Sequence, residues 1–365
     1  MNDYIKNVAG NFSFEGELTG IEPVSIGLIN DSYILSCSNN EKTIRYLLQR
    51  INNYVFKNPE NVMHNIVAVT EFLNDKAKQA NTFNPETSIY VIPTKDGKSF
   101  YISEENEYFR AYNYVQNTYS IDAVTKPEDA FNAGRAFGRF IYDLKDIESD
   151  SLCVTIPDFH NTKKRYSNLL EAIKKDEFDR LKDVRDEVRI IDQIKDDAFI
   201  ITEKFENGSI PSRVIHNDTK INNVLFDCNT HDVVCVVDLD TIMSGSFLHD
   251  FGDAITTGAS KEIDGKLLLD LDFYESYVKG FFSSCIDMLT ADEIALMPLA
   301  AKTLAFEVMT RFLADYLSGD VYFKTQYKEQ NLERTRQELS LVLDIMEKMD
   351  EMKDITKACA EEYGR

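Results

Sequence analysis

Alternating apolar and polar positions run through the first third of the chain, from about residue 17 to residue 110. This period is typical of half-buried strands, and β-branched and aromatic residues are frequent where it occurs. The segments concerned cover residues 17–27, 32–38, 43–51, 88–94 and 99–115, with one helical pattern over residues 59–78 between them. The pattern predicts a small N-terminal lobe built on an antiparallel sheet.

From about residue 126 onward the apolar positions recur every three or four residues, which is typical of amphipathic helices. The clearest helical segments cover residues 129–144, 180–197, 302–317 and 335–359. We therefore predict an α+β fold with two lobes. A nucleotide-binding lobe over residues 1–115 precedes a mainly helical catalytic lobe over residues 116–365, and a short extended segment, 112–118, joins them.

Composition and charge narrow the classes of partner. The chain has 365 residues, more than one hydrophobic core usually supports, and 43% of them are hydrophobic. The formal net charge is -22, which repels the phosphates of nucleic acids and the surface of anionic membranes. We expect neither as a partner, and an acidic surface leaves a cationic substrate possible.

Six cysteines are scattered along the chain without a CxxC pair, so neither a disulfide framework nor a zinc site is indicated. The first residues lack a basic segment followed by an apolar run, and no window reaches membrane-spanning length. We expect a cytoplasmic protein, and we favour a monomer.

The stretch over residues 214–240 carries the clearest chemistry. A short apolar strand runs into His216, Asp218 and Asn223, and a strand, a turn and a second strand then end at Asp238. Because a hairpin folds the chain back on itself, we expect Asp238 to lie near Asp218 and Asn223. Three oxygen donors would then converge.

Phosphoryl transfer needs a base that orients the attacking hydroxyl, and hard oxygen ligands for magnesium. Asp218 suits the first task, and Asn223 follows it at the offset found in the catalytic loop of protein kinases. We therefore assign Asp218 as the base, and Asn223 and Asp238 as metal ligands. We interpret His216 as structural.

A second aspartate resembles a metal ligand because Asp250 begins a literal Asp-Phe-Gly sequence. The apolar strand that should precede such a ligand lies before Asp238, not before Asp250. We therefore expect Asp250 to support the catalytic loop by hydrogen bonds. Asp240 would add a further contact around the metal.

With these residues in place, the segments IHNDTKINNVLFD and VVDLDTIMSGSFLHDFGDAI resemble the aminoglycoside phosphotransferase and choline kinase superfamily. Five segments spread over the chain are similar to bacterial N-acetylhexosamine 1-kinases: TGIEPVSIGLINDSY, YLLQRIN, RVIHNDTKINN, DLDTIMSGS and RFLADYLSGDVYF. The resemblance implies a protein-kinase-like fold, ATP and Mg²⁺. It also implies phosphorylation of the anomeric hydroxyl of N-acetylglucosamine or N-acetylgalactosamine, with Asp218 as the base.

The resemblance places the segment 25–32 over the nucleotide phosphates, although it holds a single glycine, Gly27. Gly27, Asn30 and Ser32 are the cofactor-binding candidates of this segment, and Asn113 is the candidate of the joining segment. An ordinary hairpin turn is the alternative interpretation of residues 25–32.

The strand that carries the phosphate-binding lysine in kinases departs from the pattern, because Gln49 and Arg50 stand where the lysine is expected. Neighbouring residues of a strand face opposite sides, and the sequence does not fix which of the two faces the nucleotide. Both stay candidates. Glu60 and Glu71 of the predicted helix are the possible partners, and neither is assigned.

For the acceptor, the superfamily points to the helical lobe, where Arg311 and Asp315 share a helix face. An arginine and an aspartate suit the oxygen atoms and the hydroxyl groups of a sugar, and Tyr322 and Phe323 would line the same pocket. Thr241, just after the metal aspartate, is the third candidate. An ordinary ion pair along the helix is an equally good interpretation of Arg311 and Asp315.

Two other functions fit parts of the sequence. One is a kinase of the same fold that acts on an aminoglycoside, choline or homoserine. The other is a nucleotide-binding scaffold without activity, which the single glycine and the missing lysine favour. The joint presence of Asp218, Asn223 and Asp238 argues against the scaffold.

Overall fold

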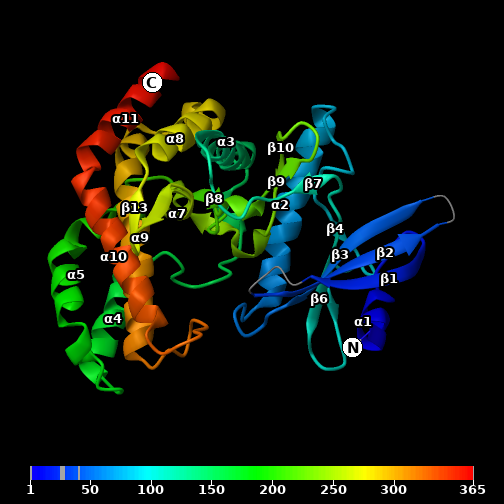
Figure 1. Cartoon of the computed structure of the whole chain (residues 1–365). Helices are drawn as coiled ribbons and strands as arrows, with labels where there is room; N and C mark the ends of the chain where they lie inside the picture. Colours follow the sequence, from blue (N-terminus) through cyan, green and yellow to red (C-terminus); the bar gives the residue numbers. More distant parts are fainter. Residues whose placement is uncertain (1, 25–28, 40–41, 365) are drawn as a thin grey trace. The chain divides into compact units, whose positions relative to one another are not determined.

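A computed structural model describes residues 2–24, 29–39 and 42–364 of the chain (Figure 1). The chain forms two compact units. Unit 1 comprises Met1–Ser120, Asp146–Pro157 and Leu225–Ser244, and unit 2 comprises Ile121–Lys145, Asp158–Val224 and Gly245–Arg365. The predicted lobe boundary between residues 115 and 116 stays a prediction.

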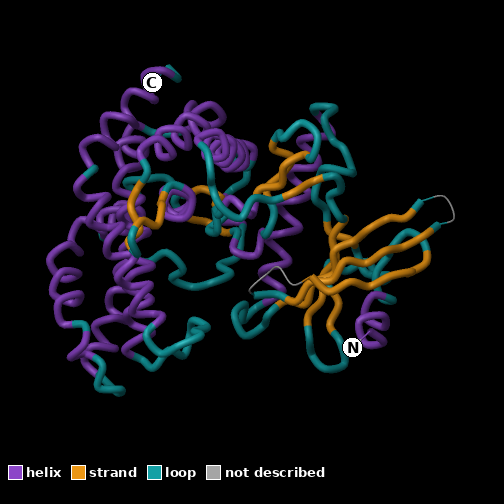
Figure 2. Tube along the Cα trace, in the orientation of Figure 1, coloured by secondary structure: helices purple, strands orange, loops and turns teal. Residues whose placement is uncertain are grey.

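Unit 1 is built on the predicted antiparallel sheet, whose strands Figure 2 shows in orange. Strands β1 (Glu17–Val24), β2 (Asp31–Ser38), β3 (Thr43–Ile51), β6 (Tyr108–Asn113) and β4 (Val91–Ile92) follow one another across it. The short strand β5 (Tyr101–Ile102) also pairs with β6. The alternation of apolar residues therefore predicted the antiparallel sheet, although the single segment predicted over residues 99–115 forms two strands, β5 and β6.

One face of this sheet carries the core of unit 1. Leu35, Leu48 and Phe109 project from β2, β3 and β6 and are fully buried. Helix α1 (Asn2–Ala9), which the pattern did not predict, packs Ile5 and Val8 against them. Since side chains alternate along a strand, the neighbours of these core residues project from the opposite face.

Helix α2 (Pro59–Gln79) begins at Asn58, whose side chain accepts the N–H of Asn61. In its interior the buried amide of Asn65 donates to the carbonyl oxygens of Cys153, at 2.7 Å, and Ile242, at 2.8 Å. Asn65 thereby fixes α2 to two distant segments of unit 1.

A second sheet of unit 1 contains the predicted strand, turn and strand. Strand β9 (Val224–Asp227) lies between β10 (Val233–Val236) and β7 (Thr118–Tyr119). Its pairing with β10 confirms the hairpin that was expected to lead to Asp238.

Unit 2 is mainly helical, as predicted. Its helices are α3 (Pro127–Asp143), α4 (Thr162–Lys175), α5 (Arg185–Ala198), α6 (Ile200–Glu206), α7 (Phe247–Gly258), α8 (Leu271–Cys285), α9 (Ala291–Leu317), α10 (Gln330–Glu347) and α11 (Met349–Glu362). A hairpin of β12 (Ser260–Ile263) and β13 (Lys266–Leu269) was not predicted. The short strands β8 (Arg213–Ile215) and β11 (Met243–Gly245) flank the catalytic stretch.

The single helix predicted over residues 335–359 is wrong, because the chain forms two helices that meet at Lys348. The ammonium of Lys348 donates to the carbonyl oxygen of Leu269, at 2.7 Å, and to the carboxylate of Asp344, at 2.8 Å. Periodicity alone does not report this contact with β13.

Helices α3 and α8 approach closely because glycines stand at their contact. A Cβ atom on Gly280 would lie 1.9 Å from the carbonyl oxygen of Phe131, and one on Gly134 would lie 2.2 Å from that of Tyr277. Only hydrogen fits at these two positions. In the described chain, none of the helices combines the length and the apolar character that crossing a membrane requires.

We expect Gly280→Ala to destabilise unit 2 by about 1–3 kcal/mol or more, because the methyl group must push the α8 backbone away from α3. Thermal unfolding should show a melting temperature several degrees lower. Gly20→Ala is the control, since its Cβ would lie at an ordinary 3.5 Å from Ser36. Equal melting temperatures for both variants would contradict this account of the packing.

Candidate active site

The predicted base lies in a loop of unit 2 that follows β8 and ends in the short 3₁₀ helix η3 (Ile221–Asn223). The amide nitrogen of Asn223 donates to the backbone oxygen of Asp218, at 2.8 Å, and to its carboxylate, at 3.1 Å. Lys220 forms an ion pair with the same carboxylate, at 2.5 Å. The structure therefore brings Asp218 and Asn223 together. Both hydrogen bonds of Asn223 use the nitrogen, so neither engages the amide oxygen.

Asp250 of α7 supports this loop. Its buried carboxylate accepts the backbone N–H groups of His216, at 2.7 Å, and Asn217, at 2.6 Å. Its own backbone oxygen accepts the hydroxyl of Thr219, at 2.6 Å. These contacts confirm the expectation that Asp250 holds the loop by hydrogen bonds.

His216 is buried within unit 2, where its ring makes T-shaped contacts with the rings of Phe137 and Phe140. Its Nδ1 accepts the backbone N–H of Asp218 at 3.3 Å. The imidazole therefore orients the backbone of Asp218, the predicted base, and the structural role of His216 is confirmed.

Asp253, one turn further along α7, is a site residue that sequence reasoning missed. Its carboxylate accepts the backbone N–H of Thr219 at 2.8 Å. Burial, and then the charge of Asp218, raise its pKa. The available signal was the helical spacing of Asp250 and Asp253, which places two carboxylates near one loop.

Asp238 belongs to unit 1, whereas Asp218 and Asn223 belong to unit 2. It follows β10, is exposed, and has a left-handed backbone with φ of 62°. This conformation is uncommon outside glycine and is often found at functional positions. The predicted approach of Asp238 to Asn223 stays a prediction.

A polar row crosses the face of the unit 1 sheet opposite the core. Ser32, Gln49 and Arg110 stand directly across from one another on β2, β3 and β6. Gln49 donates to the hydroxyl of Ser32 at 2.9 Å and accepts from Nε and Nη2 of Arg110 at 3.1 and 2.9 Å. Nη1 of Arg110 forms a buried ion pair with Asp240. The row thus connects two cofactor-binding candidates, Ser32 and Gln49, with the segment that follows Asp238.

Arg50 faces the other way. It is 42% exposed and forms ion pairs with Asp31 and Glu107. Of the two residues, Gln49 alone contacts Arg110 and Ser32, and which of them faces the nucleotide stays a prediction. Glu60 and Glu71 of α2 are both exposed.

Asn30 belongs to the same network, whereas Gly27 lies outside the described residues. The amide nitrogen of Asn30 donates to the carboxylate of Asp240 at 2.6 Å, and its oxygen accepts the backbone N–H of Asn52 at 3.0 Å. Asp240 therefore holds a guanidinium on one oxygen and an amide on the other. Sequence reasoning missed Arg110, whose single charge lies between the core residues of β6.

Two other candidates are buried in unit 1. The amide of Asn113 donates to the backbone oxygen of Ser88, at 2.7 Å, and accepts the N–H of Tyr90, at 2.9 Å. It thus holds the chain before β4. Thr241 lies in the 3₁₀ helix η4 (Leu239–Thr241), directly after Asp240.

The two acceptor candidates on α9 have different surroundings. The carboxylate of Asp315 accepts the backbone N–H groups of Tyr322, at 2.8 Å, and Phe323, at 3.0 Å. It also accepts the amide of Asn331, at 2.9 Å. The guanidinium carbon of Arg311 lies 5.5 Å from the ring centre of Phe323 and 6.0 Å from that of Tyr322. Among the described residues no ion pair joins Arg311 to Asp315, so the alternative of an ordinary intrahelical pair is not found.

A buried polar cluster lies between the loop of Asp218 and Arg311 in unit 2. Nδ1 of His160 is 3.2 Å from the carboxylate of Glu307 on α9. Burial disfavours both charges, but their mutual attraction outweighs it, so the pKa of His160 is raised and that of Glu307 is lowered. Burial, and then the neighbouring charge of Arg311, lower the pKa of Arg165. Atoms Nε2 of His160 and Nε of Arg165 have no hydrogen-bond partner among the described residues.

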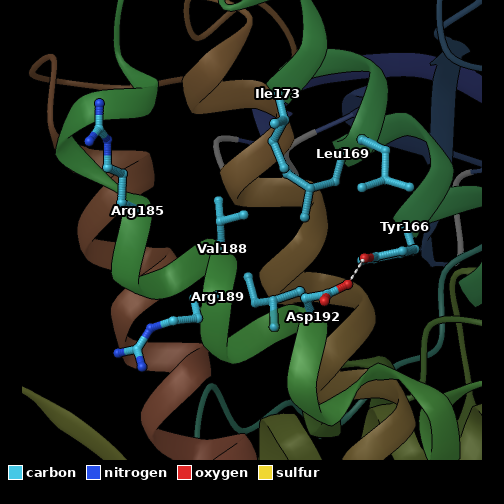
Figure 3. A pocket seen from close by; sticks show the side chains of 9 residues that line it. Tyr166, Leu169, Ile173, Arg185, Val188, Arg189 and Asp192 are labelled. Carbon is cyan, nitrogen blue, oxygen red and sulfur yellow. Dashed lines mark hydrogen bonds between the residues drawn. The ribbon is translucent and has the colours of Figure 1, made fainter.

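Figure 3 shows a pocket between α4 and α5, where Leu169, Ile173 and Val188 provide apolar walls. At its edge the hydroxyl of Tyr166 donates to Asp192 at 2.8 Å. None of the catalytic, metal, cofactor or acceptor candidates described above lines this pocket.

Comparison with known proteins gives both a family and a fold. A sequence profile of the phosphotransferase enzyme family matches residues 20–280. A spectinomycin phosphotransferase in complex with ADP and spectinomycin has 12% identity and a TM-score of 0.56, over 96% of this chain and 98% of that chain. An aminoglycoside phosphotransferase from Alicyclobacillus acidocaldarius has 11% identity and a TM-score of 0.55, over 98% and 96%.

A choline kinase from Cryptosporidium parvum has 11% identity and a TM-score of 0.53, over 99% of this chain and 100% of that chain. At such identities the likeness shows the fold alone. It confirms the predicted kinase-like fold.

Titration of Asp250 should appear in the pH dependence of stability. Burial raises its pKa to about 7, from 3.8, so between these pH values the folded protein holds a proton that the unfolded chain has lost. The free energy of unfolding should therefore fall as the pH rises through this window. Asp250→Asn removes the titration, so the stability advantage of the unaltered protein over the variant should shrink from pH 3.8 to about 7.

Denaturant unfolding at several pH values measures this difference. Asp264→Asn, an exposed position in the turn between β12 and β13, is the matched control and should leave the pH dependence unchanged. A stability difference between the unaltered protein and Asp250→Asn that is constant with pH would refute the assignment.

Proposed function

Because the chain belongs to the phosphotransferase enzyme family, we propose that it transfers the γ-phosphoryl group of ATP to the anomeric hydroxyl of an N-acetylhexosamine. N-acetylglucosamine and N-acetylgalactosamine are the proposed acceptors. The observation that carries the proposal is the loop of unit 2, in which Asp218, Asn223 and their supports are held by buried hydrogen bonds.

In this proposal Asp218 is the base. Its backbone and side chain are fixed by His216 and Asn223, so its carboxylate is preorganised to accept the proton of a hydroxyl and to orient that oxygen for attack. The attacking oxygen forms a bond to the γ-phosphorus while the bond to the β-phosphate oxygen breaks, and ADP leaves. The ammonium of Lys220 forms an ion pair with the carboxylate of Asp218.

Asn223 and Asp238 fit a magnesium ion by the chemistry of their donors. Both offer oxygen atoms, which hard divalent cations prefer, and the amide nitrogen of Asn223 is already used by Asp218. When bound, magnesium neutralises charge on the nucleotide phosphates. The residues of the chain then hold the acceptor and receive its proton.

The polar cluster of unit 2 supports a neutral, hydroxyl-rich acceptor. The guanidinium groups of Arg165 and Arg311 bring two positive charges near the carboxylate of Glu307 on α9. A cationic acceptor such as choline or an aminoglycoside would be repelled there. Sugar hydroxyls both donate and accept, and they would satisfy Nε2 of His160 and Nε of Arg165.

Arg311 is the acceptor residue that we favour on α9. Tyr322 and Phe323 flank its guanidinium, and Asp315 holds the backbone of both aromatic residues. Asp315 therefore acts through this loop rather than on the sugar. An acetamide oxygen is a suitable acceptor for the guanidinium, and the aromatic rings suit the apolar face of a sugar ring.

Asp218→Asn should lower kcat by about 100- to 10,000-fold, because the amide can no longer accept the proton of the hydroxyl. Affinity for ADP should stay unchanged, since the loop keeps its hydrogen bonds through Asn223 and Asp250. Turnover is measured as sugar-dependent ADP release. Asp264→Asn makes the same chemical change at an exposed turn and should retain full activity. Near-normal turnover of Asp218→Asn would exclude this aspartate as the base.

A panel of acceptors tests the substrate. ADP release should be stimulated most by N-acetylglucosamine or N-acetylgalactosamine, and the product should be stable to borohydride reduction because its anomeric carbon is phosphorylated. Arg311→Gln should raise KM for the sugar about tenfold or more while KM for ATP stays constant.

If choline, homoserine or an aminoglycoside stimulates ADP release most, the proposed acceptor is wrong, but the proposed phosphotransferase reaction stands. Absence of ADP release with every acceptor, despite measurable ADP binding, would favour the inactive scaffold.

A further inference from the structure

Strand β3 offers no lysine for the nucleotide phosphates, yet a cation lies beside the position where one is expected. In kinases the lysine of this strand contacts the α- and β-phosphates and pairs with a glutamate on a helix. Here Gln49 occupies the inner face of β3, and Arg110 reaches it from the adjacent strand β6. The cation nearest to the expected lysine position is therefore on the adjacent strand, β6, and not on β3.

The surroundings of Arg110 are costly to form. Arg110 is 1% exposed and Asp240 is 3% exposed, so both charges have lost nearly all contact with water. A buried ion pair of this kind contributes little to stability compared with well-packed apolar residues of similar volume. The pair is therefore better explained by a task that needs a charge than by packing.

The electrostatic setting indicates that task. An arginine side chain keeps its positive charge in proteins, and Asp240 holds this guanidinium through an ion pair while Gln49 accepts two hydrogen bonds from it. A permanent positive charge thus lies within electrostatic reach of the proposed metal ligand. Asn30, bound to the second oxygen of Asp240, connects this pair to the chain that follows residues 25–28.

The carboxylate that pairs with this cation also comes from a different element than the helix that provides it in kinases. Both glutamates that were considered on α2, Glu60 and Glu71, are exposed. Helix α2 instead contacts the segment after Asp240 through Asn65, which donates to the backbone oxygen of Ile242. The neutral amide of Asn65 therefore connects α2 to this segment, and the carboxylate that pairs with the cation is that of Asp240.

We propose that Arg110 replaces the missing β3 lysine: its guanidinium supplies the positive charge that favours binding of the nucleotide phosphates, with Asp240 as its partner. Gln49 and Ser32 orient the guanidinium from the same face of the sheet. The inference rests on the proposed use of ATP but not on the identity of the acceptor.

Binding of ADP and of adenosine to the full-length protein, measured by calorimetry without any acceptor, tests this. ADP carries the phosphates and adenosine does not. Arg110→Gln should weaken ADP at least about tenfold, or about 1.4 kcal/mol, and change adenosine by less than about twofold. Arg110→Lys keeps the charge and should retain most of the ADP affinity. Equal losses for ADP and adenosine would show a structural role and overturn the proposal.

Arg110→Gln leaves the buried carboxylate of Asp240 unpaired, which could prevent folding. A second pair of variants separates that effect from loss of the positive charge. Asp240→Asn alone keeps the cation and should still bind ADP, whereas Asp240→Asn with Arg110→Gln removes both charges and should bind ADP at least about tenfold more weakly. Equal ADP affinities of these two variants would overturn the proposal.

Exchanging the residues at positions 49 and 110 tests whether the positive charge itself is responsible for ADP affinity. Gln49→Arg with Arg110→Gln keeps the composition and returns the cation to β3, so ADP affinity should recover toward that of the unaltered protein. Arg45→Gln, which removes an exposed cation elsewhere on β3, is the matched control and should not change binding. A larger loss of ADP affinity from Arg50→Gln than from Arg110→Gln would assign the role to Arg50 instead.

Failure of this inference is distinct from failure of the proposed function. If ADP binds equally well to all Arg110 variants, sugar phosphorylation can still occur and only the role of Arg110 is lost. If no sugar is phosphorylated but the ADP affinities of the variants differ as described, the role of Arg110 stands and the proposed acceptor is wrong.

Discussion

Two backbone N–H groups of the loop that carries Asp218 donate to one buried carboxylate, that of Asp250. Buried backbone donors without acceptors are costly, so the loop keeps this shape only while Asp250 is in place. The positions of Asp218, the proposed base, and of Asn223 both follow from it. A neighbouring carboxylate, Asp253, holds the next turn of the loop through Thr219. Helix α7 thus supports the loop on which the proposed chemistry depends.

In unit 1, buried polar groups are likewise held by partners: the row of polar side chains on the sheet includes the buried guanidinium of Arg110. Hydrogen bonds between neighbouring strands pass from Ser32 through Gln49 to Arg110, and an ion pair continues to Asp240. A guanidinium forms several directed hydrogen bonds at once, so it can be held by an amide and a carboxylate together.

Local periodicity predicted the elements of the fold well, because alternation and helical spacing directly reflect which face is buried. The strands of unit 1 and the helix α2 were predicted within a few residues, and the hairpin that leads to Asp238 was found. The predicted helix over residues 335–359 was wrong at Lys348, where a contact with β13 interrupts it. Helix α1 was missed because eight residues give too short a pattern.

The sequence by itself determined that Asp218 and Asn223 lie together, since they are five residues apart and local chain geometry brings them into contact. It also predicted that Asp250 supports the loop that carries them. Only the tertiary structure decided that Gln49 rather than Arg50 faces the polar row, and that the charge beside it comes from Arg110. The reason is physical: strand pairing brings β3 next to β6, although 61 residues separate Gln49 from Arg110 along the chain, and no local pattern reports that contact.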